Sequence, residues 1–176
     1  VFNVTVENPL DKPVEVSFLA CQQNAVGYRA NQPIDVRKHP GYGSNTTGVI
    51  RDPSATLLHM TQDAPSNATA WGDMVLMALA EKVTASAGWE NLDKIGATFA
   101  ANGTLSGPDK AGPSPAGETL DGGLAVSLKV QAGQKQTVPF VLVWYFPNGQ
   151  GNWSGSRGNM YANWWPDALS LARELE

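Results

Sequence analysis

The sequence predicts a mainly β protein: an antiparallel β-sandwich with one short helix and a C-terminal helix. Eighteen glycines and twelve prolines among 176 residues indicate many turns, and therefore many short strands. Several segments alternate apolar and polar side chains, which is the period of a half-buried strand. Only the segment from Trp89 to Asn102 spaces its apolar residues by three and four, as an amphipathic helix does.

The first twenty residues predict two strands. Apolar residues alternate with polar ones over residues 2–7 and again over residues 14–20. Residues 8–13, Asn-Pro-Leu-Asp-Lys-Pro, have the composition of a tight turn. We expect the two strands to pair with each other as a hairpin.

The middle of the chain predicts further short strands, at residues 47–51, 56–61, 73–79 and 82–86. Met74–Ala80 also has helical propensity, but its shortness and its strand-rich surroundings favour a buried strand. Asn91 can cap the helix that follows, and Gly103 suits its C-terminal end.

The last third predicts two strands and a terminal helix. Residues 124–130 alternate cleanly, residues 132–134 (Ala-Gly-Gln) form a turn, and residues 137–146 return as the most hydrophobic strand. A helix follows Pro166. We interpret residues 1–163 as a β-sandwich accessory domain and residues 164–176 as the start of a linker helix.

The composition excludes several classes of function. A net charge of -4 and a pI near 5.1 give no electrostatic attraction for nucleic acid. No apolar run approaches the roughly 20 residues of a transmembrane helix. Cys21 is the single cysteine, so no internal disulfide forms; its apolar neighbours predict a small buried side chain. One thiol does not assign a compartment.

The sequence shows no catalytic or metal-binding pattern, so we expect no catalytic residue, no metal and no cofactor. We expect the two isolated histidines to be structural, His39 in an exposed loop and His59 in a strand with one hydrogen bond. Two distant histidines and one cysteine do not have zinc spacing. No spacing selects a pair of acids for glycoside hydrolysis, and we expect the candidates to be solvated: Glu81, Glu90, Glu118 and Asp121.

Aromatic residues concentrate at the C-terminal end. Four of the six tryptophans and two of the four tyrosines fall within the last 33 residues. Aromatic faces stack on sugar rings and asparagine amides bridge hydroxyls, which gives the sugar-contact candidates Trp153, Asn159, Tyr161 and Asn163. In the interpretation that we favour, these aromatic residues pack in the core or at an interface, and Trp144 and Phe146 fill the sandwich core. The domain-interface candidates are then Trp164, Trp165 and Leu169.

Short motifs resemble the N-terminal domain of glycoside hydrolase family 116, the group of the non-lysosomal (bile-acid) β-glucosidase/glucosylceramidase. The most specific ones are Trp144-Tyr-Phe-Pro-Asn148, Gly158-Asn-Met-Tyr161 and Asp167-Ala168, in that order. Upstream, residues 4–9 and 12–16 are similar to the family's first hairpin, and residues 117–126 also fit. The loops at 24–46 and 104–116 are unmatched, and Trp164-Trp165-Pro166 is bulkier than the family pattern.

The resemblance implies a β-sandwich that supports a downstream (α/α)6 catalytic barrel. Family members are retaining β-glycosidases whose nucleophile and acid/base lie in that barrel, so no catalytic position maps onto this chain. We therefore expect an inactive module whose partners are a catalytic domain of the same polypeptide and, through it, a glycoside substrate. The family's opening strands are not found before Val1, so we expect the β-domain to be incomplete there. A stand-alone carbohydrate-binding module and an Ig-like structural domain remain open alternatives.

Overall fold

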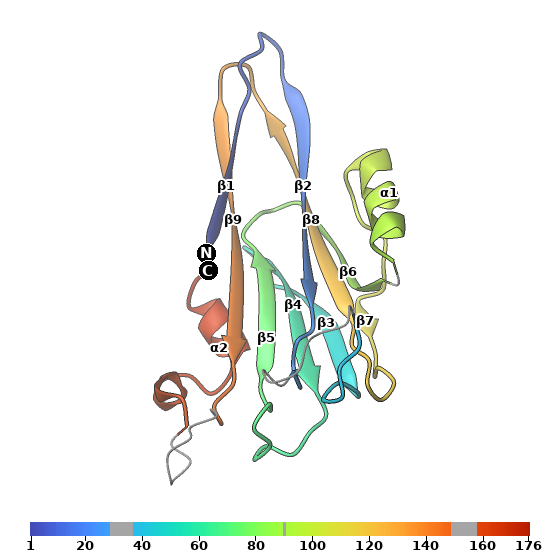
Figure 1. The fold of residues 1–176 in the computed structure, drawn as a ribbon. Helices are drawn as coiled ribbons and strands as arrows, with labels where there is room; N and C mark the ends of the chain where they lie inside the picture. The colour runs from blue at the N-terminus through green and yellow to red at the C-terminus, as the bar shows by residue number, and fades with distance from the viewer. Residues whose placement is uncertain (29–36, 90, 149–157) are drawn as a thin grey trace.

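The computed structural model describes residues 1–28, 37–89, 91–148 and 158–176. Two antiparallel sheets form the fold (Figure 1). The larger sheet has the order β1 (Phe2–Glu7), β9 (Lys135–Tyr145), β5 (Asp73–Ala78), β4 (Thr56–Gln62), β3 (Asn45–Arg51) and β7 (Lys110–Ala111). The smaller sheet has the order β2 (Val14–Gln23), β8 (Asp121–Val130) and β6 (Val83–Trp89). The predicted mainly β fold is confirmed.

The main core lies between the two sheets, where β8 packs over β4 and β5 and β6 packs over β3 and β4. Its fully buried side chains alternate along each strand, as a two-layer sandwich requires. They include Leu58, Met60, Leu124, Val126 and Val138. The predicted buried strand at 73–79 is the central strand β5, and every one of its six residues is buried.

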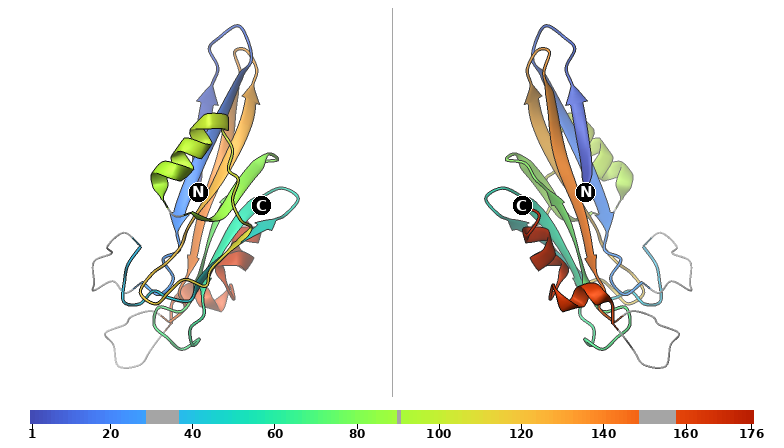
Figure 2. Two further views of the ribbon diagram at one scale, coloured as in Figure 1. Left: turned by 90° about the vertical axis from the view of Figure 1, so that its right-hand side faces the viewer. Right: turned by 90° about the vertical axis from the view of Figure 1, so that its left-hand side faces the viewer.

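Each sheet also has a helix on its outer face (Figure 2). Helix α1 (Leu92–Asn102) places Ile95 against Ala125 of β8. Asn91 caps it by accepting hydrogen bonds from two backbone N–H groups, and Gly103 ends it at φ 70°, both as predicted. Helix α2 (Ala168–Arg173) places Ala168 and Ala172 against β5 and β9. The domain therefore has four layers.

The predicted hairpin of the first two strands is wrong. β1 pairs with β9 and β2 pairs with β8, so the two strands lie in different sheets. The connection 8–13 crosses from one sheet to the other and stacks on the β8–β9 connection: the Asn8 N–H donates to Gln134 O and the Gly133 N–H donates to Asn8 O, both at 2.9 Å. The buried Asn8 side chain also donates to Val130 O. These two arches form the narrow end of the molecule in Figure 1.

The larger sheet extends beyond the smaller one on the β1 side. Trp144 alternates with Phe140 and Leu142 on the inner face of β9 and pairs with the buried Met74. It was predicted to fill the core, yet it is 55 % exposed, because the three-stranded sheet ends at β2 and does not cover it. Phe146 does pack against the core. Cys21, predicted to be buried, is exposed: it lies on the edge strand β2 and alternates with Phe18 and Ala20, which pack against the core.

Candidate functional site

The C-terminal segment contains most of the candidate residues, and it folds back over the outer face of the six-stranded sheet (Figure 2). After β9 and the described residues 146–148, a 3-10 helix, η1 (Met160–Asn163), precedes α2. Tyr161, Leu169 and Leu171 pack against the cluster formed by Val141, Val143 and Tyr145 of β9. This segment is therefore part of the domain's own packing.

Tyr161 and Asn159 clamp the segment to the end of β9. The Tyr161 hydroxyl donates to Phe146 O at 2.8 Å and accepts the Phe146 N–H at 3.0 Å. The Asn159 amide donates to Phe146 O and to the Tyr161 hydroxyl, and the Asn159 N–H donates to Pro147 O. Both side chains are thus occupied inside the chain, which leaves them less free to bridge the hydroxyls of a sugar.

Asp73 fixes the start of α2. This buried carboxylate, from β5, accepts the Ala168 N–H at 3.0 and 3.1 Å. The other neighbour of Asp73 is His59 Nε2 of β4, 2.9 Å from Oδ2; an ionised carboxylate only accepts, so the Nε2–H tautomer of His59 fits. Asp167 caps the same helix by accepting the Ser170 N–H at 2.6 Å.

A salt bridge holds the other end of α2. Arg173 Nε lies 3.0 Å from Asp52 Oδ2, in the β3–β4 connection. The hydrogen bond from Arg173 lowers the pKa of Asp52. The helix is therefore attached to β5 at its first residue and to the β3–β4 connection at its last.

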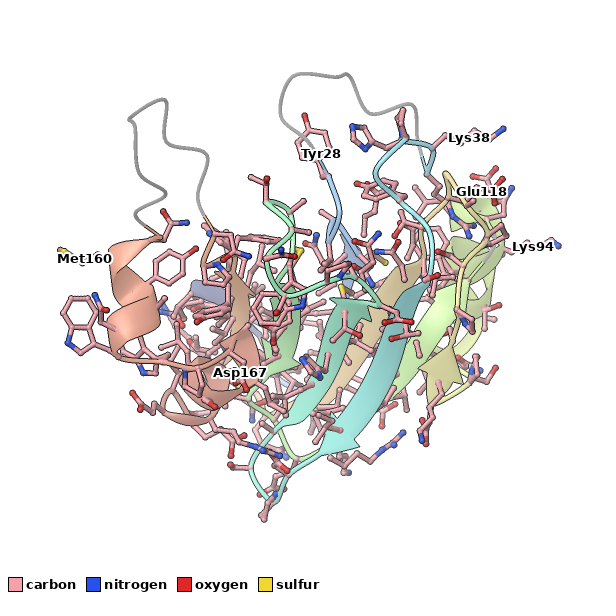
Figure 3. All side chains as sticks on the ribbon, turned by 90° about the horizontal axis from the view of Figure 1, so that it is seen from below. Tyr28, Lys38, Lys94, Glu118, Met160 and Asp167 are labelled. Carbon is pink, nitrogen blue, oxygen red and sulfur yellow. The ribbon has the colours of Figure 1, made fainter. Side chains whose placement is uncertain are left out.

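Among the described residues of this segment, three large apolar side chains are exposed: Met160 and Trp164 most, and Leu175 less. Met160 is 70 % exposed and Trp164 is 63 % exposed; Figure 3 shows Met160 pointing away from the sheets. The Trp165 ring lies 6.2 Å from the Trp164 ring, centroid to centroid, and its Nε1–H donates to Glu174 at 2.8 Å. Met160 and Trp164, with the polar Asn163 beside Trp164, form a surface that we call the apolar knuckle. Asn163 is also exposed, whereas Leu169 packs inward, and Trp153 lies outside the described residues.

The sequence of this chain is similar to that of a known protein family. The family described as "beta-glucosidase 2, glycosyl-hydrolase family 116 N-term" matches residues 1–175. The chain belongs to this family. A comparison with curated proteins finds no match. In this family 116 N-terminal domain, the most specific sequence motifs have a structural role. Phe146-Pro147 and Asn159-x-Tyr161 form the two halves of the clamp, and Asp167-Ala168 begins α2.

Both histidines of this family 116 domain make contacts inside the fold. His59 is a strand residue with a carboxylate partner, as predicted. His39 is buried, which contradicts its predicted exposure: its ring lies between those of Tyr28 and Tyr42, at 5.0 and 5.3 Å, and its Nδ1 accepts the Gly41 N–H. In the described ranges, no three His, Cys, Asp or Glu side chains gather as metal ligands.

The acids differ from one another in burial. Glu81 is exposed and Glu118 is half-buried, while Glu90 lies outside the described residues. Asp121 was predicted to be solvated but is buried, beside Arg37 at 3.4 Å. Burial raises its pKa, against the opposite effect of the Arg37 charge. Arg37 also donates to Thr119 O, which indicates a structural role for the pair at the start of β8.

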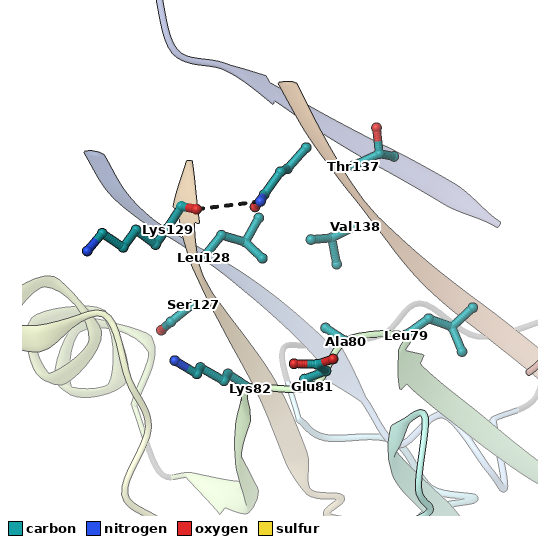
Figure 4. Close-up of a pocket in the computed structure, with 10 residues that line it drawn as sticks. Leu79, Ala80, Glu81, Lys82, Ser127, Leu128, Lys129, Thr137 and Val138 are labelled. Carbon is teal, nitrogen blue, oxygen red and sulfur yellow. Dashed lines mark hydrogen bonds between the residues drawn. The ribbon is translucent and has the colours of Figure 1, made fainter. Parts of the chain in front are cut away.

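A cavity of about 400 Å³ lies between β8, β9 and the connection from β5 to β6 (Figure 4). Leu128 of β8 and Val138 of β9 line it, together with the charged residues Glu81, Lys82 and Lys129. Among the described residues that line it, Glu81 is the one acid and none is a histidine. Separately, no helix of the described ranges is long and apolar enough to span a membrane.

Sequence reasoning missed Asp73, which organises the C-terminal segment. Its only local signal was an acid at the start of an otherwise apolar strand, Asp-Met-Val-Leu-Met-Ala. A charged residue in such a strand needs a partner if the strand is buried. That partner, the Ala168 N–H, is 95 residues away in the sequence.

Proposed function

We propose that this domain is a non-catalytic module that packs against the catalytic domain of a retaining β-glycosidase of the β-glucosidase type. The family assignment over residues 1–175 supports the enzyme class. The observation that most supports the docking role is the apolar knuckle, where Trp164 remains 63 % exposed although the helix after it is attached at both ends. A large aromatic side chain held in place on a surface is typical of an interface anchor.

The acids of the domain support a non-catalytic role. Asp52, Asp73, Asp109 and Asp121 each lie within ion-pair distance of an Arg or His side chain. A retaining glycosidase needs two carboxyl groups about 5–5.5 Å apart with a sugar between them. Acids that are paired with cations or used to cap a helix do not provide that arrangement.

We further propose that residues 147–165 lie near the rim of the sugar pocket. Within this loop, Asn163 is exposed next to Trp164, so its amide can contact a hydroxyl. Asn159 and Tyr161 would act indirectly, by fixing the loop on β9. Trp153 stays a rim candidate on sequence grounds alone.

The docking role can be tested in the native-length polypeptide. Met160→Ala with Trp164→Ala should lower the midpoint of thermal inactivation and reduce kcat/KM for an aryl β-glucoside by about tenfold, the size of one lost interface anchor. Leu92→Ala on α1 is the matched control, because Leu92 is 62 % exposed on the opposite layer. If the double variant and the control behave alike, the knuckle is not the docking surface.

A glycan-binding measurement separates the remaining alternative. The carbohydrate-binding interpretation requires soluble-glycan affinity that is lost with Trp153→Ala. The docking interpretation expects no affinity in either protein. Glycan binding that disappears in this variant would replace our proposal with a binding module.

A further inference from the structure

A small pocket lies among the loops at the end of the molecule opposite the two arches (Figure 1). Of the described residues that line it, six come from the β4–β5 connection (63–72), and the other three are Gly27, Gly41 and Gln62. We call this hollow the loop pocket. Its volume is about 270 Å³, just below the range of about 300–1,000 Å³ that is common for small-molecule sites. It is therefore sized for one small unit of a ligand.

Close backbone packing fixes the walls of the loop pocket. Gly27 and Gly41 lie so near each other that a Cβ on either would collide with the carbonyl oxygen of the other. The Gly27 N–H also donates to Ala70 O at 3.3 Å. The Gln62 amide donates to Gly41 O at 2.8 Å and to Gly43 O at 2.9 Å. Because these groups are already held in place, a ligand does not have to order them when it binds.

The loop pocket presents hydrogen-bond acceptors. Both amide hydrogens of Gln62 are used by the two glycine carbonyls, so the amide orientation is fixed and its Oε1 remains an acceptor. No described residue donates to this oxygen. Asp63 is next in the chain, and its exposed carboxylate has no hydrogen bond or ion pair within the described ranges. An ionised carboxylate only accepts, so the pocket is complementary to a ligand that carries donors.

The other lining residues favour an uncharged ligand with apolar faces. Asp63 is the one charged residue among the described residues of the wall, so an ammonium group would lose hydration for a single counter-charge. Three alanines and one proline make up the apolar part of the wall: Ala64, Pro65, Ala68 and Ala70. A sugar unit fits both features, because its hydroxyl groups donate hydrogen bonds and its C–H faces are apolar.

The loop pocket is joined to the segment that we place near the rim of the sugar pocket. Asn148, within residues 147–165, donates to Ser66 O at 2.6 Å and to Ala68 O at 2.9 Å. Both carbonyl groups belong to the β4–β5 connection, and Ala68 itself lines the loop pocket. A glycan chain that passes this rim therefore passes close to the loop pocket.

We propose that the loop pocket is a subsite for a sugar unit of the substrate that lies outside the catalytic pocket, with hydroxyl groups that donate to Asp63 and to Gln62 Oε1. This assignment rests on the proposed function, because the catalytic domain must hold the sugar that is cleaved. One sugar unit held by two acceptors gives little affinity alone, so the isolated chain is still expected to show none for soluble glycans. The substrate class that follows is an oligosaccharide of more than one sugar unit.

Kinetics of the native-length polypeptide with two substrates test this subsite. Cellotriose, a β-linked glucose trisaccharide, extends beyond the catalytic pocket, whereas an aryl β-glucoside supplies a single sugar. Asp63→Ala should raise the ratio of the KM for cellotriose to the KM for the aryl β-glucoside by about tenfold, the effect of one lost hydrogen bond to a charged group. Asp63→Asn keeps an acceptor and should raise this ratio less. Asp11→Ala is the matched control, because Asp11 is an exposed acid of the 8–13 arch at the opposite end and should leave both KM values unchanged.

The outcomes distinguish the subsite from the proposed function. If both substrates are hydrolysed and Asp63→Ala leaves the KM ratio unchanged, the subsite is refuted and the proposed function stands. The same conclusion follows if only the aryl β-glucoside is hydrolysed. If the aryl β-glucoside is not hydrolysed, the proposed function fails and the subsite fails with it. An equal rise of the ratio in Asp11→Ala would show an effect of charge at a distance, and would also refute the subsite.

Discussion

Removal of the Asp73 carboxylate should release α2 from the sheet. Asp73→Ala leaves the Ala168 N–H without a partner, and Ala168 is fully buried. A hydrogen bond to a charged group contributes about 1.5–3 kcal/mol, and an unsatisfied buried donor costs about 1–3 kcal/mol. Because the two effects overlap, we expect the free energy of unfolding to fall by about 2–4 kcal/mol. Asp73→Asn keeps an acceptor for Ala168 and should lose roughly half as much.

Urea denaturation measures this loss, and hydrogen exchange of Ala168–Arg173 locates it. The amides of α2 should exchange faster in Asp73→Ala, whereas those of α1 on the other sheet should be unchanged. Asp109→Ala is the control, because it removes an exposed carboxylate paired with Arg51 and should leave the urea midpoint unchanged. Equal midpoints for Asp73→Ala and Asp109→Ala, or normal exchange in α2, would refute this assignment.

Three further substitutions test other parts of the fold. Tyr161→Phe removes the hydroxyl that both donates to and accepts from Phe146, so thermal denaturation should show a loss of about 1–3 kcal/mol; an unchanged melting curve contradicts the clamp. Tyr42→Phe removes a buried hydroxyl that has no hydrogen-bond partner among the residues the structure describes, and it should be neutral or stabilising at pH 7. Burial raises the Tyr42 pKa from 10.0 to about 12, so wild-type stability is retained below pH 10 and falls as the pH rises to about 12. Over that pH range, urea titrations should show that Tyr42→Phe loses about 3 kcal/mol less free energy of unfolding than the wild type. Identical pH profiles for the two proteins would contradict the raised pKa of Tyr42. Gly72→Ala would place a methyl group on the carbonyl oxygen of Tyr145 and should lower the free energy of unfolding by about 1–3 kcal/mol. An unchanged melting temperature would show that the ends of β5 and β9 move apart without a loss of stability.

Local patterns predicted the elements of the fold well. Alternation placed the strands that became β1, β2 and β8 to within a few residues, and short segments between turns did the same for β3, β4, β5 and β9. The caps of α1 at Asn91 and Gly103 were readable because capping depends on the residue itself and its immediate neighbours.

Strand pairing and burial could not be predicted from the sequence to the same extent. Alternation shows that residues 2–7 form a strand, but not that the partner is β9, 128 to 138 residues away in the paired register. Trp144 has the parity of a core residue, and its exposure depends on where the opposite sheet ends. His39 looked exposed beside Pro40, yet tyrosines from two different segments enclose it. Each difference arises from contacts between distant segments.

Turnover of an aryl β-glucoside by two proteins, the native-length polypeptide and the chain Val1–Glu176, tests the central claim most directly. If this family 116 domain is a non-catalytic module, the native-length polypeptide hydrolyses the substrate with retention of configuration and the chain alone shows no turnover. Hydrolysis by the chain alone, or no hydrolysis by the native-length polypeptide, would contradict that account.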